Sequence, residues 1–143
     1  MLEKHILPAV VATLLLQVSS SAQYQQQQPR KKAPPIPVKT LTTPLPFPDV
    51  PVYTGQIRFV SGDKVEGQNV DNLCQTWHIK EGRAQAIEWY KNALSSAGWQ
   101  VTASRGTISG TKNNATVMIF INEIPLPDHY RSEMMMQYYK GSK

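Results

Sequence analysis

The chain has 143 residues with a formal net charge of +5, and its only cysteine is Cys74. Outside its terminal segments this length holds one modest hydrophobic core, and a single thiol excludes an intramolecular disulfide. Packing alone is therefore expected to stabilise the fold. Because Cys74 lies in a strand-like run, we expect a buried, unreactive thiol; a reactive or intermolecular thiol is the alternative.

The first residues have the layout of a secretory signal peptide. An apolar run covers residues 6–18, and small residues follow it up to Ala22. The run is too short to span a bilayer, which needs about 20 helical residues. We expect cleavage between Ala22 and Gln23, which gives a secreted or periplasmic protein without a transmembrane segment after processing. An uncleaved membrane anchor is the alternative.

Residues 23–46 are rich in glutamine and proline, which predicts a linker in extended polyproline II geometry. The segment contains four basic residues and no acidic one, namely Arg30, Lys31, Lys32 and Lys39. These charges either make weak contact with an anionic envelope surface or only keep the linker soluble. The remainder of the chain is nearly neutral, so nucleic acid is not an expected partner.

Residues 47–143 are expected to form one domain. Its first segment, residues 46–55, contains three prolines, which favours an extended entry arm over a helix. Residues 56–61 and 70–79 then alternate between apolar and polar side chains, as half-buried strands do. Gln75 is the exception, because it stands in the apolar phase of the second strand.

The period changes at Arg83. From there apolar residues recur at intervals of three and four, which predicts one apolar stripe on an amphipathic helix. The stripe consists of Ala86, Ile87, Tyr90, Ala93, Leu94 and Ala97. Gly98 follows the last of them, where a left-handed residue commonly ends a helix.

Three short apolar segments follow, at residues 99–103, 107–111 and 115–122, and turn residues separate them as in antiparallel hairpins. The third segment is apolar on both faces, which indicates a central strand. Residues 130–140 are either a strand or a helix, and the alternation of their apolar residues favours a strand. The predicted fold is an α+β two-layer sandwich, with one amphipathic helix packed on an antiparallel sheet in the order β-β-α-β-β-β-β.

Two segments resemble a known type of domain: residues 49–55 (DVPVYTG) and residues 87–99 (IEWYKNALSSAGW). They are similar to small, uncharacterised exported bacterial domains, in which a D-x-P-x-Y-P-G arm precedes a helix with an F-Y-x3-L-x3-G-W pattern. Thr54 stands where those domains usually have proline, and Trp89 where they usually have phenylalanine. The resemblance covers most of residues 47–122. It implies bacterial export and the fold above, and it supplies no catalytic residues.

The titratable residues form no recognisable catalytic motif. After the predicted cleavage the histidines are His78 and His129, and neither has a partner at metal-ligand spacing. We therefore expect no metal, no cofactor and no enzymatic activity. The adjacent Asp128 and His129 could orient an imidazole as in a hydrolase, but no nucleophile motif accompanies them.

Aromatic and methionine side chains are the better candidates for binding. We expect Trp77 and Trp99 in the core, whereas Trp89 lies at the border of the helical stripe. In the predicted last strand, Met135 points away from its two neighbouring methionines. The candidate binding residues are therefore Trp89, His129 and Met135.

The expected function is an exported, non-enzymatic binding or structural module of the bacterial cell envelope. Its partner would be an unknown protein or an envelope polymer. A glycan-binding module that uses surface aromatics is the alternative, and a hydrolase built around His129 is the less favoured one.

Overall fold

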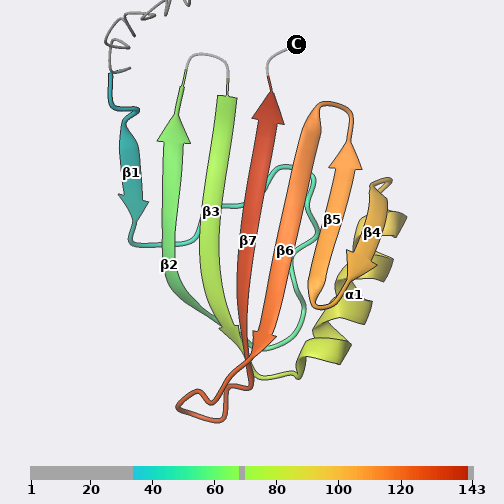
Figure 1. The fold of residues 1–143 in the computed structure, drawn as a ribbon. Helices are drawn as coiled ribbons and strands as arrows, with labels where there is room; N and C mark the ends of the chain where they lie inside the picture. Colours follow the sequence, from blue (N-terminus) through green and yellow to red (C-terminus); the bar gives the residue numbers. More distant parts are fainter. Residues whose placement is uncertain (1–33, 68–69, 142–143) are drawn as a thin grey trace, which may run out of the picture. The chain divides into compact units, whose positions relative to one another are not determined.

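The computed structural model describes residues 34–67 and 70–141, which form one sheet with one helix packed against it (Figure 1). The elements are β1 (Val38–Leu41), β2 (Ile57–Glu66), β3 (Val70–Ile79), α1 (Arg83–Ser96), β4 (Gln100–Ser104), β5 (Thr107–Lys112), β6 (Ala115–Glu123) and β7 (Ser132–Gly141). The sheet is seven-stranded and antiparallel throughout, in the order β1-β2-β3-β7-β6-β5-β4. The α+β fold class is therefore confirmed, and the predicted order of elements is found from β2 onward.

Strand β1 lies within the segment that the sequence predicts to be linker. It pairs antiparallel with β2, with Leu41 opposite Gly62, and the compact unit begins at Pro34 instead of Phe47. The four residues of β1 contain no proline and include the β-formers Val38 and Thr40, and an edge strand needs a hydrogen-bonding partner on one side only. The prolines on both sides of these residues favour a linker, so the sequence does not indicate this short strand.

Strand β7 occupies a central position between β3 and β6. Met134 stands opposite Trp77 of β3 on one side and opposite Ile121 of β6 on the other. The preference for a strand over a helix at residues 130–140 is thus confirmed.

One face of the sheet carries the core. Helix α1 packs on this face over β4, β5 and β6. The buried apolar side chains are Tyr53, Leu73, Trp77, Ile79, Ala86, Tyr90, Leu94, Trp99, Ile108, Ala115, Val117, Ile119, Ile121, Met134, Met136 and Tyr138. The predicted core positions of Trp77 and Trp99 are confirmed.

Residues 44–55, here called the strap, complete the cover of this face. Figure 1 shows the strap passing behind the sheet on its way from β1 to β2. The ring of Phe47 lies 5.7 Å from that of Trp77, and Tyr53 stacks on Tyr90 at 5.6 Å between ring centroids. The indole N–H of Trp99 donates to the backbone carbonyl of Asp49 at 2.9 Å. The strap is therefore part of the core packing.

Both ends of α1 depend on residues outside it. Gly82 precedes the helix without a side-chain cap, and the backbone N–H of Arg83 donates to the Glu123 carboxylate at 3.3 Å. At the other end Gly98 has φ of +83°, and the N–H of Trp99 donates to the carbonyl of Leu94 at 3.0 Å. The predicted helix end at Gly98 is confirmed.

Candidate functional site

The face of the sheet opposite the core, here called the open face, carries neither α1 nor the strap. Figure 1 shows the sheet from this face, with both elements behind it. Strand alternation separates the two faces: Met134 and Met136 are buried in the core, whereas Met135 is partly exposed on the open face. Met135 stands opposite Phe120 of β6, and Met118 lies two residues before Phe120 on the same face.

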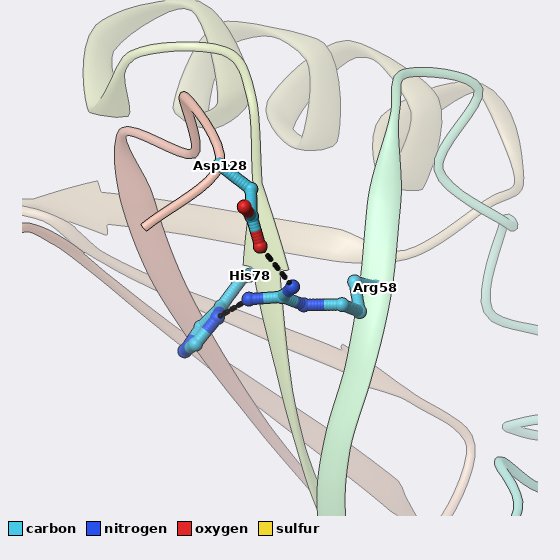
Figure 2. A network of polar contacts seen from close by, with 3 residues as sticks. All are labelled: Arg58, His78 and Asp128. Carbon is cyan, nitrogen blue, oxygen red and sulfur yellow. Dashed lines mark hydrogen bonds and ion pairs between the residues drawn. The ribbon is translucent and has the colours of Figure 1, made fainter. Parts of the chain in front are cut away.

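A cluster of polar side chains lies at one end of the open face (Figure 2). Arg58 of β2 stands opposite His78 of β3, and Asp128 reaches them from the loop between β6 and β7. The Arg58 guanidinium donates to Asp128 Oδ2 at 2.9 Å through Nη1 and to His78 Nδ1 at 3.1 Å through Nη2. On its other side, His78 Nε2 lies 3.6 Å from Glu133 Oε2.

This geometry determines the tautomer of His78. A guanidinium only donates hydrogen bonds, so Nδ1 must accept and carries no proton. Neutral His78 then carries its proton on Nε2, which faces Glu133. Nδ1 is thus occupied by the Arg58 guanidinium, and the His78 side chain is only 14% exposed. Among the described residues no hydroxyl or thiol is hydrogen-bonded to this ring, so the cluster has no nucleophile that His78 could activate.

The loop carrying Asp128 has an unusual backbone. Asp128 and His129 are consecutive residues with φ of 60° and 62°, in the left-handed region that side chains other than glycine rarely adopt. The Arg58 guanidinium carbon lies 4.6 Å from the centroid of the Tyr130 ring, in the range of a cation–π contact. Arg58 therefore holds the loop at two points. Because the Asp128 side chain is 70% exposed, its ion pair contributes about 1 kcal/mol or less to stability.

The three sequence-predicted binding residues do not form one site. Trp89 lies on α1, on the core side of the sheet, and is partly buried edge-on against Tyr53 at 4.9 Å and Tyr90 at 4.8 Å. Met135 lies on the open face. His129 is exposed, and within the described part of the chain its side chain makes no hydrogen bond or ion pair.

The contact between Asp128 and His129 that the less favoured hydrolase would use is not found among the described residues. Asp128 instead binds Arg58, which the sequence did not single out. The register between β2 and β3 brings Arg58 to His78, and it includes a bulge between Phe59 and Ser61. A bulge of this kind has no sequence pattern strong enough to place it.

Cys74 also lies on the open face and is partly buried, less so than the sequence predicts. Burial, with a further contribution from the Asp63 carboxylate, raises the pKa of the Cys74 thiol. Among residues 34–67 and 70–141, no three histidine, cysteine or acidic side chains gather closely enough to hold a metal ion.

The described part of the chain contains no helix with the length and apolar character needed to cross a membrane. The signal peptide, its cleavage site and the basic cluster at residues 30–32 lie outside the described residues and stay predictions. Comparisons with protein families, curated proteins and solved structures find no match to this chain, so the resemblance to exported bacterial domains also stays a prediction.

Proposed function

We propose that the chain is an exported, non-enzymatic binding module of the bacterial cell envelope, and that it binds a protein partner through the open face. The observation that carries this proposal is the difference between the two faces of the sheet. One face is covered by α1 and the strap, whereas the other presents partly exposed Met118, Phe120 and Met135 with no described element across it.

The composition of the open face supports a protein contact. Its apolar centre is flanked by neutral side chains such as Thr76 and Gln137, and charged side chains gather at the end where Arg58 lies. An apolar centre with a polar rim is the usual anatomy of a protein interface, and methionine adapts its shape to a partner. The Arg58 guanidinium occupies Nδ1 of His78, so this nitrogen is not available as a general base, which supports binding over hydrolysis.

Photo-crosslinking in the native envelope tests this proposal. We expect benzoylphenylalanine in place of Phe120 to give one defined crosslinked protein. The control is the same group in place of Asn92, which is exposed on the outer side of α1 and should give no such product. Equal crosslinking from both positions, or none from Phe120, would contradict the proposal. Amino-terminal sequencing of the exported protein tests export, and a chain that still begins at Met1 would refute cleavage.

A glycan is the second candidate partner, and Tyr139 is the observation that favours it. Tyr139 is 47% exposed and lies on the open face. It stands opposite Asn72 and Thr116, whose neutral side chains can hydrogen-bond to sugar hydroxyls. Titration calorimetry with soluble envelope polysaccharide tests this role. Tyr139→Ala should abolish binding, whereas Tyr139→Phe retains the ring and should retain most of it. Equal affinities of the two variants would exclude stacking on Tyr139.

A further inference from the structure

We infer a second binding site, on the opposite side of the sheet from the open face, which takes the hydrocarbon chain of a small uncharged molecule. The site is a cavity of about 230 Å³ between the strap and the core. Phe47 and Val50 of the strap form one wall, and Trp77, Met134 and Met136 of the sheet form the other. This inference does not depend on the function proposed for the open face.

The lining selects against charge. Among the described residues, no acidic, lysine, arginine or histidine side chain lines the cavity, and the only ionisable groups of its lining are the phenols of Tyr53 and Tyr90. Burial, followed by the nearby Glu81 carboxylate, raises the pKa of Tyr53 to about 12, and burial also raises the pKa of Tyr90. Both phenols therefore stay neutral at physiological pH. A charged ligand group would lose its hydration there without gaining a partner, so only an apolar group gains by entering.

The volume sets the size of the ligand. An apolar cavity of about 150 Å³ stays dry and accepts benzene, which has six carbon atoms. Scaled from that case, a cavity of 230 Å³ accommodates roughly nine carbon atoms. Met134 and Met136 supply flexible thioether walls, which adjust to an unbranched chain better than rigid walls do.

The mouth of the cavity lies at the strap. Val52 lines the cavity and is 77% exposed, so the lining reaches the surface there. Within the described chain, no backbone–backbone hydrogen bond joins residues 44–55 to the sheet. The strap is instead fastened by side chains, at Leu45 by Gln75 and at Asp49 by Trp99. A ligand can therefore enter past Val52 without breaking the sheet ladder.

The methionines allow a direct test, because they report separately on the two faces. The full chain, labelled with ¹³C at the methionine methyl groups, is titrated with 1-butanol, 1-hexanol, 1-octanol and 1-decanol. We expect the Met134 and Met136 signals to shift and those of Met118 and Met135 to stay. Affinity should rise about fourfold for each added methylene and level off near nine carbon atoms. No shift with any alcohol, or equal shifts on both faces, would overturn the inference.

Matched valine variants test the location. Val50→Phe fills the cavity, whereas Val60→Phe adds the same ring at an exposed position that does not line it. We expect 1-octanol to bind at least tenfold more weakly to the first variant and unchanged to the second. If Val50→Phe fails to fold, Val52→Phe narrows the mouth from the surface and should also weaken binding. Unchanged affinity in a folded variant of either lining residue would refute the site.

The source of the hydrocarbon is tested with two ligands of equal chain length. If 1-octanol and octanoyl-lysophosphatidylcholine both shift Met134 and Met136, the cavity takes a lipid tail whose headgroup stays outside. If only 1-octanol shifts them, the ligand is a free small molecule. If neither does, the inference fails, and the crosslinking result at Phe120 is unaffected.

Discussion

Gln75 gives the sharpest test of how the strap is held. Its amide is fully buried in the apolar face of β3 and makes two hydrogen bonds to the backbone of Leu45. The Leu45 N–H donates to Oε1 at 2.9 Å, and Nε2 donates to the Leu45 carbonyl at 2.8 Å. Gln75→Leu removes both bonds. At about 1 kcal/mol for each, the free energy of unfolding should fall by about 2 kcal/mol.

Thermal and urea unfolding measure this loss. For a domain of this size, 2 kcal/mol corresponds to a decrease in Tm of roughly 8 °C. Gln137→Leu is the matched control, because Gln137 is exposed on the neighbouring strand opposite Cys74. Its effect should stay within about 0.5 kcal/mol. If the two variants prove equally stable, the amide of Gln75 does not fasten the strap and the reasoning is wrong.

The charge variant Gln75→Glu adds a pH dependence. Burial disfavours the carboxylate, so the pKa of the introduced acid is raised in the folded state above its unfolded value of about 4.3. The folded chain then holds the proton longer than the unfolded chain does. The stability of the variant should therefore be greatest below about pH 4.3 and decrease as the pH rises from there through the raised pKa of the folded state. A variant whose stability relative to wild type does not change between pH 4 and 8 would show that position 75 is hydrated.

Three further predictions concern other parts of the fold. Gly55→Ala should lower the free energy of unfolding by about 2 kcal/mol, because the added Cβ would lie 2.4 Å from Cε1 of Tyr53. Gly141→Ala is the control: its Cβ would have no atom nearer than 3.8 Å, so urea unfolding should show almost no change. Because the pKa of Tyr53 is raised from 10.0 to about 12, stability should decline between these pH values, and Tyr53→Phe should remove this part of the decline. The raised pKa of Cys74 should make its reaction with a disulfide reagent at pH 8 slower in the folded than in the urea-unfolded chain, and Asp63→Asn should accelerate it; equal rates would contradict this.

Periodicity predicted the elements that bury a continuous stripe or a full face. The helix from Arg83 and the strand that contains Ile119 both follow their periods over several turns or residues, and each lies in the structure where the sequence places it. Strand β1 is too short to show a period, and its pairing depends on β2, which the residues of β1 themselves do not specify. Short edge strands are therefore the part of this fold that sequence reasoning missed.

The polar contacts were less predictable than the elements. The sequence shows that Gln75 is a polar residue at an apolar position of its strand. Its hydrogen-bonding partner could not be predicted, because Leu45 lies thirty residues away and bonds through its backbone. The contact between Arg58 and His78 depends on a strand register that includes a bulge. The position of Asp128 further depends on a left-handed backbone that no residue type requires. These features arise from tertiary geometry, which local patterns do not encode.

The central position of β7 has a consequence for synthesis. The ribosome makes β3 and β6 before Ser132–Gly141, and neither strand has its partner on the β7 side until that segment has emerged. Until then, β1–β2–β3 and β4–β5–β6 are two separate groups of three strands with no strand to join them. The complete sheet can therefore form only after β7 has been made, because β7 is the strand that joins the two groups.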